Sequence, residues 1–154
     1  MKVRDIMETK LITVPVGTPY ADVMKILRNN HVSGAPVVDE EGHLVGVVSE
    51  KDLFRILYPF YQSYYMHPEQ YVNHEEREKK AGDIRKHRVE IFMSPSPFTA
   101  EPDMPIMQAG ALMLSKKVHR LPVVEEDKLV GIVSRGRIYR TVMDMNYKDF
   151  IATE

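Results

Sequence analysis

The chain contains two copies of one sequence unit, and this internal repeat limits the folds that are open to it. Identical residues of the two copies lie 86 positions apart, in the pairs Met7/Met93, Thr13/Thr99, Pro19/Pro105, Val32/Val118, Pro36/Pro122, Val37/Val123 and Val38/Val124. The segment from Leu44 to Ser49 then recurs at a spacing of 85, as residues 129 to 134. Because a unit of about 55 residues is too small to bury a good core alone, we expect the two copies to pack face to face as one module with pseudo-twofold symmetry.

Each copy has the sequence pattern of strand, helix, strand, strand and helix. In the first copy, Thr18 and Pro19 indicate a helix start with Thr18 as the N-cap, and Asn29 with Asn30 indicates its end. Ser49 is expected to cap a second helix that continues to Leu57. The predicted elements are strands 12–14, 35–38 and 44–48 with helices 19–30 and 50–57, and strands 98–100, 121–124 and 129–133 with helices 105–115 and 134–143. This order predicts an α/β fold with two β-α-β-β-α repeats.

The composition is that of an ordinary globular protein, with 44% hydrophobic and 28% charged residues among 154. The chain has no apolar run of 18 residues, which a membrane-spanning helix needs. Asp5 interrupts the first apolar stretch, so the N-terminus does not read as a signal peptide, and we expect a cytoplasmic protein without a membrane partner. The net charge of −1 lacks the positive excess typical of nucleic-acid-binding domains, so a nucleic-acid partner is not expected.

The sequence carries no pattern of metal binding or catalysis. There is no cysteine, which excludes disulfides, thiolate metal sites and a cysteine nucleophile. The six histidines lack metal-ligand spacing, and neither a glycine-rich phosphate loop nor a nucleophile elbow occurs. We therefore expect no metal site, no catalytic residue and no cofactor, and we do not expect an enzyme. A phosphotransferase or a nucleotide hydrolase is the alternative, which turnover of ATP with magnesium would reveal.

The repeated pattern resembles a pair of cystathionine-β-synthase (CBS) domains, together called a Bateman module. The resemblance covers about residues 1–57 and 89–145 and rests on the doubled pattern of apolar-Pro-Val-Val, acidic turn and Leu-Val-Gly-Val-Val-Ser. It implies two small sheets that face each other across a cleft, in a module that is not catalytic and binds an adenosine-containing ligand. We accordingly divide the chain into repeat one at 1–57, a linker at 58–88, and repeat two with a C-terminal tail at 89–154.

Asp52 follows Ser49 by three residues, where a strand passes into a helix. One interpretation is a helix cap, in which Ser49 and Asp52 satisfy free backbone amides. The resemblance implies another, in which Asp52 accepts the ribose hydroxyls of a nucleotide. Repeat two keeps the cap serine as Ser134 but has Arg137 in place of the aspartate. Since Ser134 is explained by capping alone, we favour a ligand role for Asp52.

His119 and Arg120 stand directly before Leu121 in repeat two. The pair resembles the phosphate-contacting pair in the γ regulatory subunit of AMP-activated kinase. Arg120 could instead form a surface ion pair, and His119 could be a histidine at the edge of the core. Because the guanidinium fork matches phosphate oxygens, we favour a phosphate contact for Arg120 and leave both interpretations of His119 open.

The resemblance implies two ligand sites, each combining residues of both repeats. Site A would combine Ser49 and Asp52 with Thr99, Ala100, His119, Arg120 and Leu121. Site B would combine Ser134 and Arg137 with Thr13, Val14, Ser33, Gly34 and Ala35. Arg137 cannot accept a hydrogen bond from ribose, so site B is either empty or takes a ligand with Arg137 on its phosphate. We expect site A to be the better nucleotide site.

The segment between the repeats is aromatic at its start and basic at its end. Five of the eight tyrosines lie within 58–71, and Arg85 to Arg88 form a short basic run. The rings could pack the linker onto the module, stack on an adenine or form a dimer surface. The basic run could be a solvated face, lie near the cleft mouth, or contact nucleic acid, which the overall charge disfavours.

The leading hypothesis is a stand-alone energy-sensing module that binds AMP, ADP or ATP and signals to an unknown partner protein. S-adenosylmethionine is a less favoured ligand, because a phosphate-binding arginine would then lack a purpose. The alternative is an interaction protein with no working site. In either case we expect a homodimer through apolar helix faces, which carry Leu53, Phe54, Ile56 and Leu57 in repeat one, and Ile138, Tyr139, Val142 and Met143 in repeat two.

Overall fold

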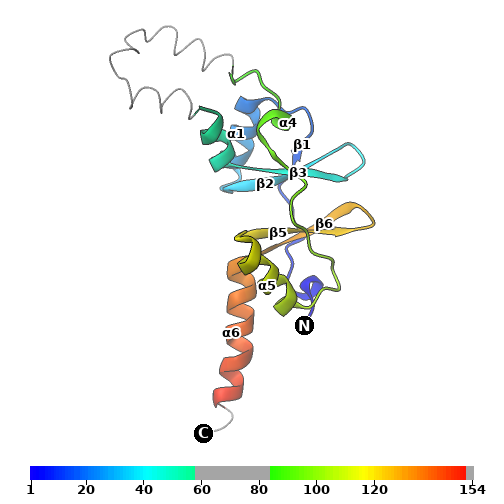
Figure 1. The fold of residues 1–154 in the computed structure, drawn as a ribbon, viewed down its shortest axis with the longest axis vertical. Helices are drawn as coiled ribbons and strands as arrows, with labels where there is room; N and C mark the ends of the chain where they lie inside the picture. The colour runs from blue at the N-terminus through cyan, green and yellow to red at the C-terminus, as the bar shows by residue number, and fades with distance from the viewer. Residues whose placement is uncertain (58–83, 152–154) are drawn as a thin grey trace, which may run out of the picture. The chain divides into compact units, whose positions relative to one another are not determined.

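The computed structural model describes residues 1–57 and 84–151, which form two compact units (Figure 1). The first unit is Ile12–Ser96, and the second combines Met1–Leu11 with Pro97–Glu154. The units therefore do not coincide with the two copies of the sequence repeat. Residues 1–11 belong to the unit that holds the sheet of repeat two, and residues 84–96 belong to the unit that holds the sheet of repeat one. We call 1–11 and 84–96 the crossing segments.

The first unit is built on a four-stranded sheet of order β1-β2-β3-β4. Its strands are β1 (Val14–Pro15), β2 (Gly34–Val38), β3 (Leu44–Ser49) and β4 (Ser94–Pro95). β1 runs parallel to β2, and the other pairs are antiparallel. The helical segments of this unit are α1 (Tyr20–Asn29), residues 50–57 and α4 (Val89–Phe92). The α/β class is thus confirmed, and β4 is a strand that the repeat pattern did not predict.

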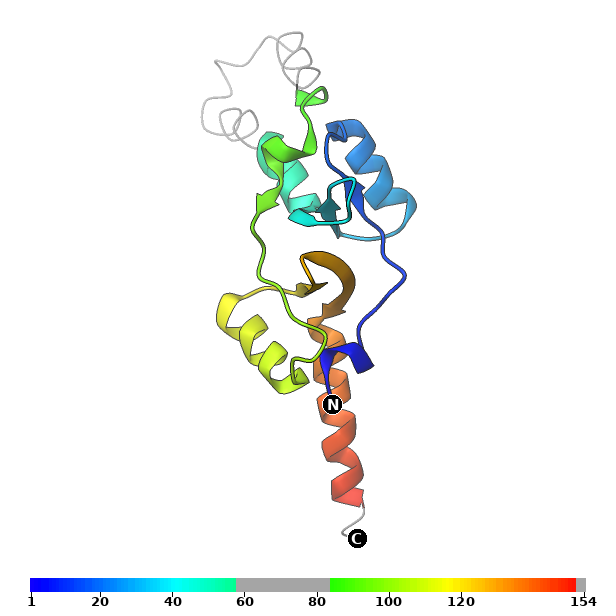
Figure 2. The same cartoon turned by 90° about the vertical axis from the view of Figure 1, so that its right-hand side faces the viewer.

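The second unit repeats this arrangement around the hairpin of β5 (Arg120–Glu125) and β6 (Lys128–Ser134). Single bridges extend the hairpin on both sides, from Ala100 to Val123 and from Glu8 to Ile132, in the places that β1 and β4 take in the first unit. Its helices are η1 (Val3–Asp5), α5 (Ile106–Lys116) and α6 (Arg135–Ile151). α5 and α6 pack on each other and on the hairpin, and α6 continues well past them (Figure 2).

The start of α1 shows how a crossing segment changes local structure. Thr18 is not the N-cap: α1 begins at Tyr20, and the Thr18 hydroxyl donates instead to the carbonyl of Pro15 at 2.6 Å. The backbone amide of Tyr20 donates to His87 at 2.8 Å, and that of Val89 donates to Thr18 at 2.8 Å. The crossing segment therefore satisfies the amide that a side-chain cap was expected to serve. The predicted end of the helix is confirmed, with Asn30 as the C-cap.

Each unit has its own apolar core, to which the crossing segment contributes. In the first unit, Ile84, Val89 and Phe92 join the residues of the sheet and α1. In the second, Val3 and Ile6 join those of α5, α6 and the hairpin. The largest fully buried side chains are Leu27, Val14, Val23, Val37, Val48 and Val89 in the first core, and Val3, Met113, Leu121, Ile138, Val123 and Val133 in the second.

Tyr20 ties three segments of the first unit together. Its ring packs edge-on against Phe92 with centroids 5.4 Å apart, and its buried hydroxyl donates to the carbonyl of Leu53 at 2.9 Å. Tyr20→Phe keeps the ring contact but leaves that buried carbonyl without its donor. We expect urea unfolding to show a loss of about 1 kcal/mol. Tyr139→Phe in the second unit is the control, and an equal loss there would contradict this account.

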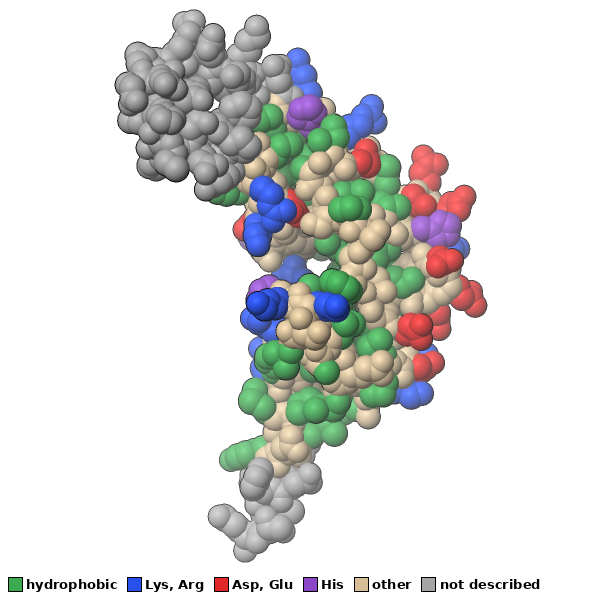
Figure 3. Space-filling model, viewed as in Figure 1, with side chains coloured by type: hydrophobic (Ala, Val, Ile, Leu, Met, Phe, Trp, Pro, Cys, Tyr) green, Lys and Arg blue, Asp and Glu red, His purple; other side chains and the backbone are tan. Residues whose placement is uncertain are grey.

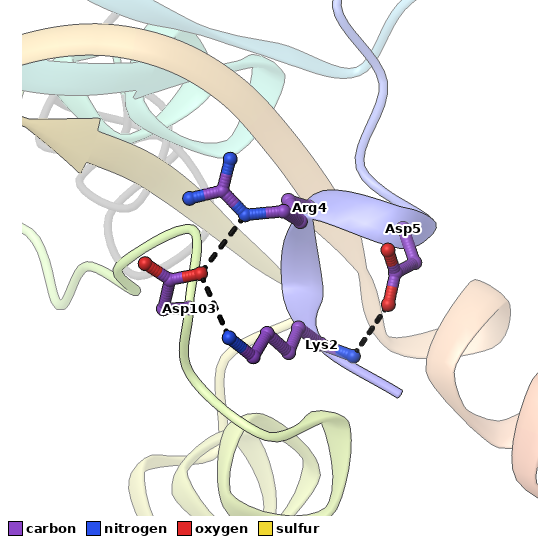
Figure 4. A network of polar contacts seen from close by, with 4 residues as sticks. All are labelled: Lys2, Arg4, Asp5 and Asp103. Carbon is purple, nitrogen blue, oxygen red and sulfur yellow. Dashed lines mark hydrogen bonds and ion pairs between the residues drawn. The ribbon is translucent and has the colours of Figure 1, made fainter.

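Asp103 forms polar contacts with the N-terminal segment of the second unit (Figure 4). Its Oδ1 accepts from Arg4 Nε at 2.9 Å and contacts Lys2 Nζ at 3.2 Å, while Asp5 Oδ2 accepts from the Lys2 amide at 2.8 Å. The hydrogen bond from Arg4, and then that from Lys2, lowers the pKa of Asp103 below its ordinary value. These side chains are exposed, so the stabilisation is small and screened by salt.

The lowered pKa of Asp103 fixes the direction of a pH effect. A carboxyl with a lower pKa in the folded state stabilises the protein above its unfolded pKa, and this contribution is lost as pH falls through the folded pKa. The stability difference between the wild type and Asp103→Asn should therefore be constant near neutral pH and shrink as pH falls below about 4, the ordinary pKa of an Asp carboxyl. Urea unfolding across this range measures it. A difference that stays constant with pH would contradict the assignment.

Candidate functional site

The first unit holds seven of the predicted site residues, which lie on or next to β1, β2 and β3 and on the helix that follows β3. Gly34 pairs with Ser49 across β2 and β3, and the amide of Glu50 donates to the carbonyl of Ser33 at 2.9 Å. Val14 lies on β1, the neighbour of β2. The predicted residues that belong to this unit are Thr13, Val14, Ser33, Gly34, Ala35, Ser49 and Asp52. Ser49 and Asp52 belong to the predicted site A. The other five residues belong to the predicted site B.

Asp52 is the one charged side chain in the buried set of the described residues, with 5% exposure. Its Oδ2 accepts from the amide of Ser49 at 2.9 Å and from the Ser49 hydroxyl at 3.1 Å. The Asp52 amide in turn contacts the Ser49 oxygen at 3.3 Å. This reciprocal pattern is the helix cap that the sequence indicated. The cap uses only one of the two carboxylate oxygens.

The other oxygen of Asp52 contacts Arg55, a residue that sequence reasoning missed. Arg55 Nη1 lies 3.5 Å from Oδ1, and the Arg55 side chain is 61% exposed. The signal was available, because an arginine three residues after an aspartate on a helix lies on the same face. A hydrogen bond of 3.5 Å is long, so Oδ1 keeps most of its capacity to accept from another donor.

The second unit holds the other seven predicted residues, which lie on or next to its hairpin and in the first turn of α6. The amide of Ala100 donates to Pro122 and the amide of Val124 donates to Ala100, both at 2.9 Å, which sets Ala100 beside β5. Arg120 pairs with Ser134 where β5 begins and β6 ends. The predicted residues of this unit are Thr99, Ala100, His119, Arg120, Leu121, Ser134 and Arg137.

Burial separates the predicted residues into two kinds. The side chains of Val14, Ala35, Ala100 and Leu121 belong to the cores, with at most 5% exposure, so these positions can offer a ligand only their backbone. The exposed side chains are Ser33, Thr99, His119, Arg120 and Arg137. The interpretation of His119 as a core-edge residue is therefore wrong, since His119 is exposed and outside the core of its unit.

Ser134 caps α6 without an aspartate. The amide of Arg137 contacts Ser134 Oγ at 3.3 Å, and the Arg137 side chain is exposed. The comparison of the two units thus agrees with the sequence: one capping serine has a buried carboxylate beside it, and the other has an arginine. Sites A and B each draw on both units, and they stay predictions.

The remaining predictions concern the two parts of the linker, a metal site and a membrane-spanning helix. The aromatic part of the linker lies outside the described residues. The basic run at its end is described. Its last residue, Arg88, forms an isolated antiparallel β-bridge with Pro19, so part of this run pairs with the segment before α1. Within residues 1–57 and 84–151, no group of three or more His, Asp or Glu side chains is placed to hold a metal ion. No helix in that part of the chain is long and apolar enough to span a membrane.

Comparison with known proteins gives the family. The sequence profile of the CBS domain matches residues 3–59 and 84–144. A protein of Methanocaldococcus jannaschii designated MJ1426 is 31% identical, over 93% of this chain and 92% of its own length. The solved structure of CBSX2 in complex with AMP is 30% identical, with a TM-score of 0.72 over 94% of this chain and 98% of that one.

A second solved structure carries a different kind of ligand. It is the CBS domain pair of protein MJ0100 in complex with 5′-methylthioadenosine and S-adenosyl-L-methionine, 25% identical with a TM-score of 0.68. It covers 94% of this chain and 98% of its own. Together with the two profile matches and the doubled arrangement of the two units, these likenesses show that the chain belongs to the CBS domain family and is a tandem pair of CBS domains.

Proposed function

We propose that this CBS pair is a regulatory module that binds an adenine nucleotide and passes the binding event to a partner protein. The observation that carries the proposal is the Asp52 carboxylate. It is buried at the end of β3, its Oδ2 is used by the helix cap, and its Oδ1 can still accept a hydrogen bond. A buried carboxylate oxygen aimed at a ligand suits the paired hydroxyls of a ribose.

The proposed site A places the base and the phosphate on the second unit. The backbone of Ala100 and Leu121 would serve the adenine, and Arg120 would contact the phosphate. The exposure of Arg120 at the start of β5 supports this role. An exposed guanidinium can bind a phosphate without any change in the packing of the core. The AMP bound to the CBSX2 relative supports the ligand class.

Titration calorimetry of the nucleotide-stripped full chain tests the proposal. AMP, ADP, ATP and S-adenosylmethionine are titrated separately. We expect saturable binding of at least one adenine nucleotide. Binding of S-adenosylmethionine alone would indicate a ligand like that of the MJ0100 relative. Arg120 would then have no phosphate to contact, and its proposed role would be wrong. No binding of any of the four would contradict the proposal.

A dimeric interaction surface is the second candidate function. Of the residues expected at a dimer interface, Leu53 and Ile138 are buried in their own cores and cannot form one. Met143 on α6 is 60% exposed, and Met145 and Tyr147 further along are 44% and 65% exposed. We propose that α6 packs against a second copy of the chain. Sedimentation equilibrium should show a dimer that Met143→Ser weakens, and a monomeric wild type would contradict this.

A further inference from the structure

Four arginines of the second unit, Arg120, Arg135, Arg137 and Arg140, gather where β5 and α6 begin; we call them the α6 arginine cluster. Arg120 pairs with Ser134, whose hydroxyl caps the amide of Arg137. The amide of Arg135 donates to the carbonyl of His119 at 2.9 Å, which holds the first turn of α6 against the start of β5. These contacts bring the backbone positions of Arg120, Arg135 and Arg137 together at one end of the hairpin.

Arg140 reaches back to this surface across a glycine. A Cβ atom on Gly136 would stand 3.2 Å from Arg140 Nη1 and 3.6 Å from Nη2, so the guanidinium lies over the bare backbone of Gly136. Long helical side chains point towards the N-terminus of their helix, which brings Arg140 to the first turn of α6. Figure 3 shows Lys and Arg side chains gathered over the start of β5 and α6, with acidic side chains over the β5–β6 turn at the other end of the hairpin.

The first unit shows that the fold does not require this charge. The matching positions there are Gly34, Glu50, Asp52 and Arg55, whose formal charges sum to −1, against +4 for the cluster. Arg55 contacts the carboxylate of Asp52, whereas Arg135, Arg137 and Arg140 form no ion pair within the described residues. At these four positions the two repeats have the same place in the fold and differ in charge.

The arginines are also unfavourable for the isolated protein. Cations in the first turns of a helix oppose its dipole, and arginines three residues apart, such as Arg137 and Arg140, repel each other. Their planar forks suit phosphate oxygens, each by two parallel hydrogen bonds. A single phosphate cannot engage several guanidinium groups fully, but a chain of phosphates can.

We propose that the α6 arginine cluster binds the polyphosphate chain of a nucleoside triphosphate, so that the protein prefers a triphosphate to a monophosphate. This inference rests on the proposed nucleotide function for the nucleoside part of the ligand. The polyphosphate part rests only on the second unit. The ligand is a small polyphosphate, and nucleic acid is an outcome of the test.

The test is calorimetric titration of the full chain with inorganic tripolyphosphate, orthophosphate, AMP and ATP at about 0.15 M salt. Wild-type protein should bind tripolyphosphate more tightly than orthophosphate, and ATP more tightly than AMP. The double variant Arg135→Ala/Arg137→Ala should weaken tripolyphosphate and ATP by about tenfold or more, with little change for AMP. Because the arginines oppose the helix dipole, the variant should also unfold at a temperature no lower than the wild type, which shows that it remains folded.

Lys25→Ala/Arg28→Ala on α1 is the matched control, since it removes the same charge from exposed positions of the first unit. The inference is overturned if the two double variants weaken tripolyphosphate equally, or if wild-type protein does not distinguish tripolyphosphate from orthophosphate. A single-stranded oligonucleotide that binds the wild type more tightly than tripolyphosphate, and depends on Arg135 and Arg137, would also overturn it.

The experiment separates this inference from the proposed function. If tripolyphosphate binds through the cluster but no nucleotide responds to a change at Asp52, the cluster stands and the nucleotide function fails. If AMP and ATP bind equally and both depend on Asp52, the nucleotide function stands and the cluster inference fails.

Discussion

Asp52→Asn should weaken the binding of an adenine nucleotide by about 10- to 100-fold. The substitution keeps the size of the side chain but removes the charge of its hydrogen-bond acceptor. A hydrogen bond to a charged group contributes about 1.5 to 3 kcal/mol, which corresponds to that range of affinity. The buried position of Asp52 strengthens the effect, because little water competes for the carboxylate. Calorimetry of wild type and variant with the same nucleotide measures it.

Asp39→Asn is the matched control for this prediction. Asp39 lies in the same unit, and its Oδ1 accepts backbone hydrogen bonds from Glu41 and His43 at 2.9 Å, so the variant loses the same charge from a similar local arrangement. Asp39→Asn should leave the affinity unchanged. If Asp52→Asn lowers the free energy of unfolding but leaves the affinity at the wild-type value, Asp52 serves only as a helix cap.

Gly46→Ala should lower the free energy of unfolding by about 1 to 3 kcal/mol, because the added methyl group has no space. A Cβ atom on Gly46 would lie 2.6 Å from the sulfur of Met93 and 2.9 Å from the backbone oxygen of Ser94. The crossing segment would have to move away from β3, which breaks the pairing of β3 with β4. Urea unfolding with circular dichroism measures the loss.

The same contact in the second unit gives a graded comparison. A Cβ atom on Gly131 would lie 2.6 Å from the sulfur of Met7, but the nearest backbone oxygen, that of Glu8, is 3.1 Å away. Since the methionine side chain can move more easily than backbone, Gly131→Ala should cost less than Gly46→Ala. Gly136→Ala on α6 is the control and should stabilise by up to about 1 kcal/mol through helix propensity. Equal effects of all three would contradict close docking of the crossing segments.

The repeat made the order of elements predictable, but not their assignment to units. Periodicity and turn residues report on local structure, so α1, β2, β3, β5 and β6 lie within a few residues of their predicted positions. The docking of segments 1–11 and 84–96 depends on contacts between residues far apart in sequence. The Thr18 prediction was wrong for the same reason, since the partner of the Tyr20 amide is His87 and not a neighbouring side chain.

The candidate site was predictable to the extent that its chemistry lies in short segments. The cap by Ser49 and Asp52 follows from their spacing, and the structure confirms it. The burial of Leu121 follows from packing, which a single sequence does not reveal, and it limits this residue to backbone contacts. The Arg140 guanidinium lies over the backbone of Gly136, where a Cβ atom would be in its way. The sequence contains both residues, but only the structure shows this contact.

The central claim is that one nucleotide contacts Asp52 through its ribose and Arg120 through its phosphate. Calorimetric titration with adenosine and with AMP, on wild type, Asp52→Asn and Arg120→Ala, tests this most directly. The account predicts that Asp52→Asn weakens both ligands by the same factor, while Arg120→Ala weakens AMP by about tenfold or more and leaves adenosine unchanged. Equal affinities of all three proteins for both ligands, or no binding of either ligand to the wild type, would contradict it.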